Sequence, residues 1–173
     1  MNEVERLADQ MVLLDKGRVV AVGPLAELQA DPKSLLATSQ EAGVSLRGVI
    51  EESETRFGLL RVSLRGGHIL VPSASGAVGD QIRVRILATD VSLAREPPGR
   101  SSILNVLPAQ IVATNALNAH EVLAAVSLGE NGAGARLLAR VAQKSWEELG
   151  FAQGQNVFAQ VKSVALGRAN APE

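Results

Sequence analysis

The chain has 173 residues, which is enough for one ordinary domain or two small ones. A formal net charge of −1 and a hydrophobic content of 46% describe a globular protein with no built-in attraction to nucleic acid or to an anionic membrane surface. The sequence has no cysteine, which excludes disulfides, thiolate metal sites and cysteine nucleophiles.

Residues 1–32 are expected to form a small α/β segment. The apolar side chains of residues 2–8 share one helical face, so a short helix is predicted there. A β-hairpin is predicted over 11–22, because two β-rich runs flank a turn in which Gly17 can take a positive φ. A second short helix is predicted over 24–30, with proline at its first position.

Two similar series of strands are predicted to fill the rest of the chain. Residues 33–43 mix Pro, Ser, Thr and Gly and are expected to be a linker. Beyond them, RVSLRGG in one series of β-rich runs is answered by AAVSLGE in the next. We therefore expect two repeats, 44–96 and 97–168, each a small five-stranded β-barrel, and a tail at 169–173. The second repeat also carries an insert, KSWEELGF, in which Ser145 is placed to cap a helical turn.

Groups that could carry catalysis are scarce. The two histidines, His68 and His120, lie in strand or pre-strand contexts, where a satisfied or solvent-facing ring is the better expectation. No cluster of His, Asp and Glu has the spacing of metal ligands. The sequence has no GxxxxGK[ST] phosphate loop. The chain is therefore not expected to be an enzyme or to contain an ATP site.

Two stretches of the second repeat have the residue types of an oxyanion site. Ser101 and Ser102 directly precede an apolar strand, where hydroxyls and free backbone N–H groups can point the same way. A turn closed by serine would explain the same residues. FAQVKSVAL is expected to be a strand in which Lys162 is buried or half-buried, and an external anion could then pair with its ammonium group. A lysine that extends from an edge strand into solvent is the alternative.

The sequence resembles a known family over nearly its whole length. LADQMVLLDKGRVVAVGPLAEL resembles the segment that ends the ATPase domain of ABC importers. ATDVSLAREPPGRSSILNVLPAQIV and VFAQVKSVAL resemble the C-terminal regulatory region of molybdate-importer ATPase subunits. The resemblance implies a mostly β fold with two tandem OB-like, molbindin-like (Mop/TOBE) barrels after a short α/β segment. It also implies that the catalytic motifs of the ATPase lie upstream of this chain.

The resemblance implies a site as well. Barrels of that family bind molybdate or tungstate at subunit contacts through serine hydroxyls, backbone N–H groups and a lysine. Mapped onto this sequence, the oxyanion-binding residues are Ser101, Ser102, Ile103, Asn105, Lys162 and Ser163. The first repeat has Leu87 where a lysine would be expected and keeps only Ser45 and Thr89 as candidates. The better site is therefore expected in the second repeat.

The function implied is an oxyanion-binding regulatory module of a molybdate importer. It would sense intracellular molybdate or tungstate and dimerise the ATPase subunits through the barrels. Its partners would be a second copy of the chain and the membrane permease subunits, at the cytoplasmic face of the membrane. A purely structural dimerisation domain with no bound oxyanion is the alternative. An OB-type nucleic-acid binder is less favoured, because neither a basic groove nor stacking aromatics are evident.

Overall fold

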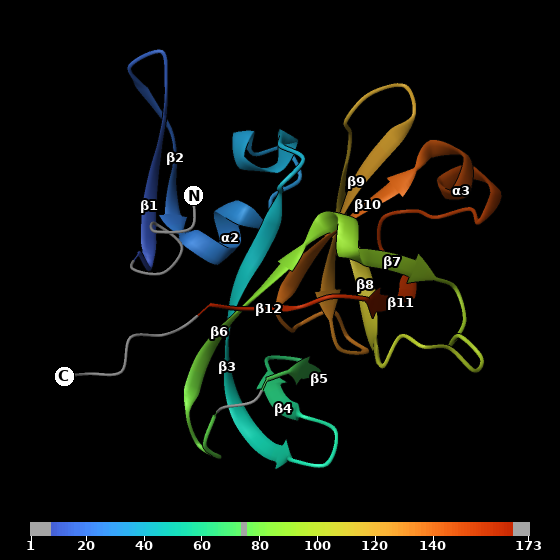
Figure 1. Ribbon diagram of the computed structural model, residues 1–173. Coiled ribbons are helices and arrows are strands. Elements are labelled where there is room, and N and C mark those ends of the chain that lie inside the picture. Colours follow the sequence, from blue (N-terminus) through green and yellow to red (C-terminus); the bar gives the residue numbers. More distant parts are fainter. Residues whose placement is uncertain (1–7, 74–75, 168–173) are drawn as a thin grey trace.

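The computed structural model describes residues 8–73 and 76–167 (Figure 1). Two five-stranded antiparallel sheets, each curled, lie beside one another, and a two-stranded hairpin stands to one side of them (Figure 1). The chain is therefore mostly β, as predicted. The helix predicted over 2–8 lies almost entirely outside the described residues.

The N-terminal segment contains the predicted hairpin and the second predicted helix. The hairpin pairs β1 (Gln10–Asp15) with β2 (Arg18–Pro24), and Gly17 in its turn has a φ of 77°. The short helix α2 (Leu25–Gln29) follows directly. Pro24 is its N-cap rather than its first helical residue, because its ψ of 134° is extended.

The linker packs against both barrels. It contains a turn of 3₁₀-helix, η1 (Leu35–Thr38). Arg85 of the first sheet donates from Nη2 to the carbonyl of Glu41 at 2.8 Å, and Arg140 of the second sheet donates from Nη2 to the carbonyl of Ser39 at 2.8 Å. The linker is thus held between the two sheets by arginines from each.

Both sheets are antiparallel. Their strands end at the turn residues that the sequence analysis placed between the predicted strands. The first sheet has the order β12-β6-β3-β4-β5, formed by Ala165–Gly167, Gln81–Leu87, Gly43–Glu54, Leu59–Leu64 and Gly67–Pro72. The second has the order β10-β9-β8-β11-β7, formed by Arg136–Ala142, Glu121–Leu128, Asn105–Ala116, Asn156–Val161 and Val91–Ala94. Strands such as β4 and β6 alternate buried side chains with more exposed ones, whereas Val122–Leu128 of β9 is buried throughout and Leu137, Leu138 and Ala139 of β10 are buried in succession.

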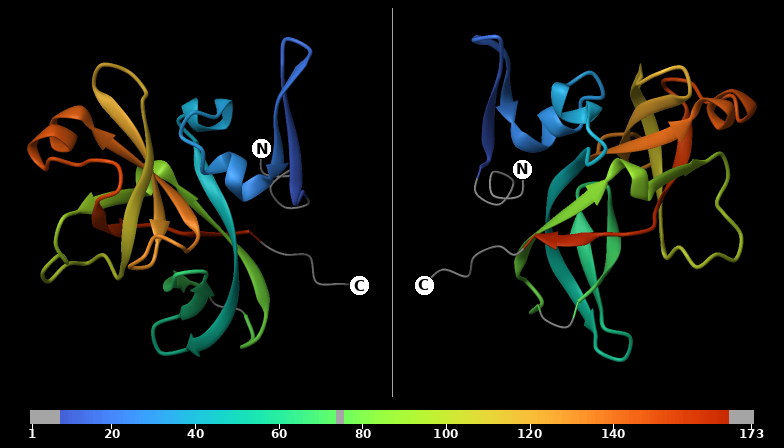
Figure 2. Two further views of the ribbon diagram at one scale, coloured as in Figure 1. Left: turned by 180° about the vertical axis from the view of Figure 1, so that it is seen from behind. Right: turned by 45° about the horizontal axis from the view of Figure 1, so that its top comes forward.

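The repeats are not the self-contained barrels that the sequence division at residue 96 implies. The last strand of the first repeat, β7, pairs with β11 of the second sheet, and the last strand of the second repeat, β12, pairs with β6 of the first. Figure 2 shows the red C-terminal strand crossing from the second sheet to the first. The exchange occurs where two predicted long strands break, at η2 (Ala88–Asp90) and at Lys162 to Val164. Each barrel therefore depends on the other repeat for its fifth strand.

A single hydrophobic core runs through both barrels, with buried side chains from both sheets in one cluster. The barrels also approach closely at two turns. The N–H of Ala135 donates to the carbonyl of Arg65 at 2.6 Å. A Cβ on Gly134 would lie 2.4 Å from the carbonyl oxygen of Leu128 and 2.5 Å from that of Arg65, so only glycine fits there.

One further helix, α3 (Gln143–Glu148), covers an end of the second barrel. The prediction that Ser145 caps it is wrong: the N-cap is Ala142, and Ser145 lies inside the helix. The ring of Trp146 packs against Phe151, with 5.5 Å between the centroids. Among the residues described, every helix is too short or too polar to cross a lipid bilayer.

Candidate functional site

The two stretches singled out in the second repeat meet at one pocket of about 220 Å³. They meet because β8 and β11 are antiparallel neighbours that pair Asn105 with Val161, so the residues before β8 and those after β11 share one end of the sheet. The pocket is lined by four of the predicted residues, Ser102, Asn105, Lys162 and Ser163. Its remaining wall is apolar and comes partly from the first barrel, through Leu59, Leu70 and Pro72.

Lys162 differs in setting from the sequence prediction. It follows the last residue of β11, and its side chain is exposed rather than buried within a strand. Its backbone N–H donates to the carbonyl of Asp90 at 2.9 Å, which fixes the chain where it crosses to the other sheet. Within the described part of the chain Lys162 forms no ion pair, and no carboxylate lines the pocket. Its ammonium group is thus available to an anion.

Ser101 and Ile103 do not line this pocket. The backbone N–H of Ile103 donates to Oγ of Ser101 at 3.1 Å, which closes a local turn. This hydrogen bond closes the turn that the sequence analysis gave as the alternative explanation for Ser101. The Ile103 N–H can bind an anion only if this bond is given up. Ser102, the next hydroxyl along, is exposed and makes no such bond among the described residues.

The side chain of Asn105 already has partners. It is 8% exposed, and its Oδ1 accepts from the N–H of Leu70 at 2.7 Å while its Nδ2 donates to the carbonyl of Leu70 at 2.9 Å. This reciprocal pair fastens the start of β8 to β5, the edge strand of the first sheet. Asn105 thus lines the pocket, but both polar atoms of its amide are hydrogen-bonded to the first barrel.

The two candidates in the first repeat are not brought together in a pocket that contains both. Ser45 lies on β3, and its backbone N–H donates to Oε1 of Gln29 at 2.9 Å. Ser45 lines a different hollow, which lies beside the N-terminal segment. Thr89 is exposed in η2 and lines neither that hollow nor the pocket at Lys162.

The apolar wall of the pocket was missed in the sequence. Leu59, Leu70 and Pro72 belong to the first repeat, and their alternation marks only strands with one buried face. No local signal shows that they close a site built from the second repeat. A partial signal existed in Asn105, a polar residue at the start of an apolar strand that needs hydrogen-bond partners when buried.

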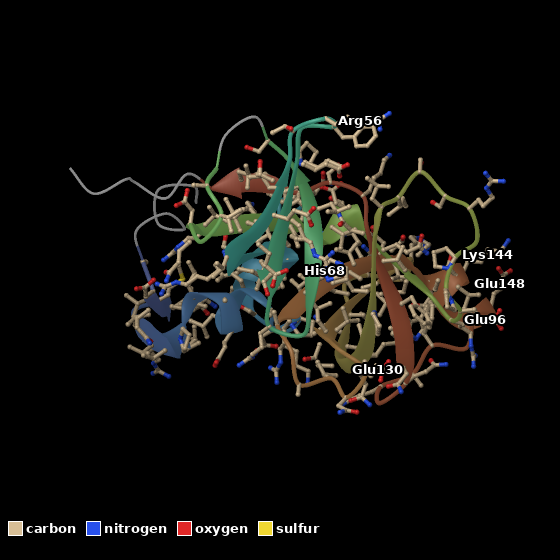
Figure 3. All side chains as sticks on the ribbon, turned by 90° about the horizontal axis from the view of Figure 1, so that it is seen from below. Arg56, His68, Glu96, Glu130, Lys144 and Glu148 are labelled. Carbon is tan, nitrogen blue, oxygen red and sulfur yellow. The ribbon has the colours of Figure 1, made fainter. Side chains whose placement is uncertain are left out.

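Both histidines face solvent, as expected. The side chain of His68 lies at the surface of the first sheet (Figure 3), and its Nδ1 is 3.2 Å from Nη2 of Arg61. His120 is exposed in the turn before β9. In residues 8–73 and 76–167, no three His, Asp or Glu side chains are grouped so that they could hold a metal ion.

Comparisons with known proteins agree with this architecture. A family model described as the TOBE domain matches residues 101–166. The chain is 51% identical over 166 residues to the molybdenum import ATP-binding protein ModC of Rhodopseudomonas palustris (strain HaA2), a match that covers 96% of this chain and 44% of that protein. It is 43% identical over 166 residues to ModC of Rhodobacter capsulatus, covering 96% of this chain and 46% of that protein. The chain thus spans less than half the length of these relatives.

A solved structure shares the fold. It is the cytoplasmic molybdate-binding protein ModG with molybdate bound, which superposes with a TM-score of 0.60 at 21% identity and covers 71% of this chain and 94% of that chain. The predicted class, a mostly β protein with paired OB-like barrels of the Mop/TOBE type, is confirmed by this likeness and by the two curled sheets.

Proposed function

This chain belongs to the TOBE-domain region of the molybdenum import ATP-binding proteins, and on that premise we propose that it is an oxyanion-binding regulatory module. The ligand would be molybdate or tungstate, held in the pocket at the end of the sheet where β8 begins and β11 ends. One observation carries the proposal: Ser102, Lys162 and Ser163 line one pocket that has no carboxylate. Binding there would report the anion concentration inside the cell to the transporter.

The chemistry of the pocket suits a tetrahedral dianion. Molybdate has only acceptor oxygens, so its site needs hydrogen-bond donors, a positive charge and no competing carboxylate. Lys162 supplies the charge, and Ser102 and Ser163 supply hydroxyl donors. A charge-assisted hydrogen bond contributes about 1.5–3 kcal/mol before desolvation, so about four or five well-aimed donors, three of them these side chains, would give a dissociation constant of about micromolar.

We further propose that the barrels pair in a homodimer that covers this pocket. The pocket is open, and Leu104 on its rim is 63% exposed. A second copy packed over Leu104 would bury that side chain and shield the anion from water. The proposal extends to the whole subunit, which would contact the membrane permease subunits at the cytoplasmic face. A dimerisation domain without an anion remains the second candidate.

Thermal unfolding in the presence of anions tests the proposal. Molybdate or tungstate at a hundred times its dissociation constant should stabilise the protein by about 2.7 kcal/mol, and sulfate at the same concentration should stabilise it less. If neither molybdate nor tungstate raises the unfolding temperature, while light scattering still shows a dimer, the structural dimerisation domain is the correct function.

The proposed homodimer can be tested by a substitution at its contact. Replacing Leu104 with Asp places a charge on the proposed contact and should weaken self-association at least about tenfold, or about 1.4 kcal/mol. Light scattering over a concentration series measures it. Leu35→Asp is the control, because Leu35 is 56% exposed on η1 in the linker. An unaltered protein that stays monomeric at every concentration would contradict the prediction, as would equal effects of the two substitutions.

A further inference from the structure

A second hollow, of about 530 Å³, lies between the N-terminal segment and both barrels. Its charge is unusual for a protein with net charge −1. Arginines reach it from four elements: Arg47 on β3, Arg65 in the β4–β5 turn, Arg83 on β6 and Arg136 on β10. Only two carboxylates line it, Asp9 and Glu27. The hollow therefore carries a surplus of positive charge.

Two of these arginines would repel each other without an anion between them. Arg47 and Arg83 are directly opposite in the pairing of β3 with β6. Like charges at directly opposite positions destabilise a sheet. In this structure Nη2 of each arginine donates to the same oxygen, Oδ1 of Asp9. The hydrogen bond from Arg47 is the largest cause that holds the pKa of Asp9 below its ordinary value; desolvation opposes it, and the charge of Arg47 and the hydrogen bond and charge of Arg83 lower the pKa further. The carboxylate of Asp9 is thus an anion bound between the guanidinium groups of Arg47 and Arg83.

The other two arginines, Arg65 and Arg136, add positive charge that no ion pair among the described residues neutralises, although Glu27 also lines the hollow. Nη2 of Arg65 donates to the carbonyl of Gly134 at 3.2 Å, which is an uncharged partner. Arg136 is exposed, and neither it nor Arg65 forms an ion pair in the part of the chain that the structure describes. A neighbouring hollow on β3 and β4 shares Arg47 and Arg65 and is also lined by one carboxylate, Glu51.

We propose that Arg47, Arg65, Arg83 and Arg136 form a second anion site, separate from the pocket at Lys162, for a small phosphate-bearing molecule with more than one negative charge. Planar guanidinium groups match phosphate oxygens with two parallel hydrogen bonds, and several can surround one ligand. A hollow of about 530 Å³ is within the range of small-molecule sites and leaves room for more than one tetrahedral group. Asp9 is the internal competitor, because its carboxylate takes the position of one ligand oxygen between Arg47 and Arg83.

Titration calorimetry of the whole chain with inorganic pyrophosphate, at fixed ionic strength and without phosphate buffer, tests this site. We expect saturable binding that Arg47→Met and Arg65→Met each weaken at least about tenfold. Asp9→Asn should tighten binding severalfold, since the substitution removes the competing charge while keeping the side-chain shape. Arg56→Met is the matched control, because Arg56 lies at the tip of the β3–β4 turn, 5.0 Å over the ring of Phe57 (Figure 3).

Three outcomes would contradict the proposed second anion site. The first is that pyrophosphate shows no saturable binding, and the second is that Arg56→Met weakens pyrophosphate binding as much as the other arginine substitutions do. The third is that Asp9→Asn binds pyrophosphate no more tightly than the unaltered protein. Loss of pyrophosphate binding in Lys162→Met would show that only the first pocket binds anions. Hydrogen exchange of the unaltered protein gives a second measurement that needs no substitution. Pyrophosphate should change exchange at β3 and β6, and a change confined to the β11–β12 junction would count against the proposal.

Discussion

Replacing Lys162 with Met should weaken molybdate binding about 10- to 100-fold, so that molybdate at a hundred times the dissociation constant of the unaltered protein stabilises the variant by only about 0.4–1.4 kcal/mol instead of about 2.7 kcal/mol. Lys162 supplies the one positive charge on the lining of this pocket. Its loss leaves two neutral hydroxyls to hold a dianion, and a hydrogen bond from a charged group contributes about 1.5–3 kcal/mol. Met retains the length of the side chain. Because Lys162 is exposed, the unfolding temperature without anion should change little.

Lys144→Met is the matched control for this experiment. Lys144 lies on α3, where its side chain is 82% exposed and its Nζ is 3.6 Å from Oε1 of Glu148 (Figure 3). Such a surface pair contributes little to stability, so Lys144→Met should respond to molybdate as the unaltered protein does. Calorimetric titration measures both variants. Undiminished molybdate binding by Lys162→Met would remove the central residue from the proposed site.

Replacing Asn105 with Leu should lower the free energy of unfolding by about 2–4 kcal/mol, and the melting temperature by about 5–15 °C. The two hydrogen bonds of 2.7 and 2.9 Å between Asn105 and the backbone of Leu70 would both be lost. Leu is close to Asn in size but cannot replace either bond. The N–H and carbonyl of Leu70 would then lie at the contact between the barrels without a partner, and each unsatisfied buried group costs about 1–3 kcal/mol. Denaturant unfolding measures the change.

Asn156→Leu is the control for Asn105→Leu. Asn156 is exposed on β11, and its Oδ1 accepts one long hydrogen bond of 3.3 Å from Nε2 of Gln110. Its loss should cost no more than about 0.5 kcal/mol, as for most surface substitutions. The pair of variants also separates two roles for Asn105. A stable Asn105→Leu protein that no longer responds to molybdate would make Asn105 an anion ligand rather than a tie between the barrels.

Local pattern accounts for much of the fold. Alternating apolar residues and the turn glycines predict the hairpin of β1 and β2 and the central strands of each sheet, because one buried face and tight turns are local requirements. The family resemblance, rather than this local pattern, predicts that Ser102, Lys162 and Ser163 share a site, and antiparallel pairing of β8 with β11 brings them to one end of the sheet. Whether they bind molybdate stays a prediction.

The sequence by itself determined the class of fold, the positions of most strands and the residue types of the candidate site. Only the tertiary structure decided which sheet β7 and β12 join, that Asn105 pairs with Leu70, and that four arginines line one hollow together with Asp9. The physical reason is that these features depend on contacts between residues far apart in the sequence. A strand's own residues specify that it pairs and which face it buries, but the choice between two similar open sheet edges depends on the packing of the whole chain.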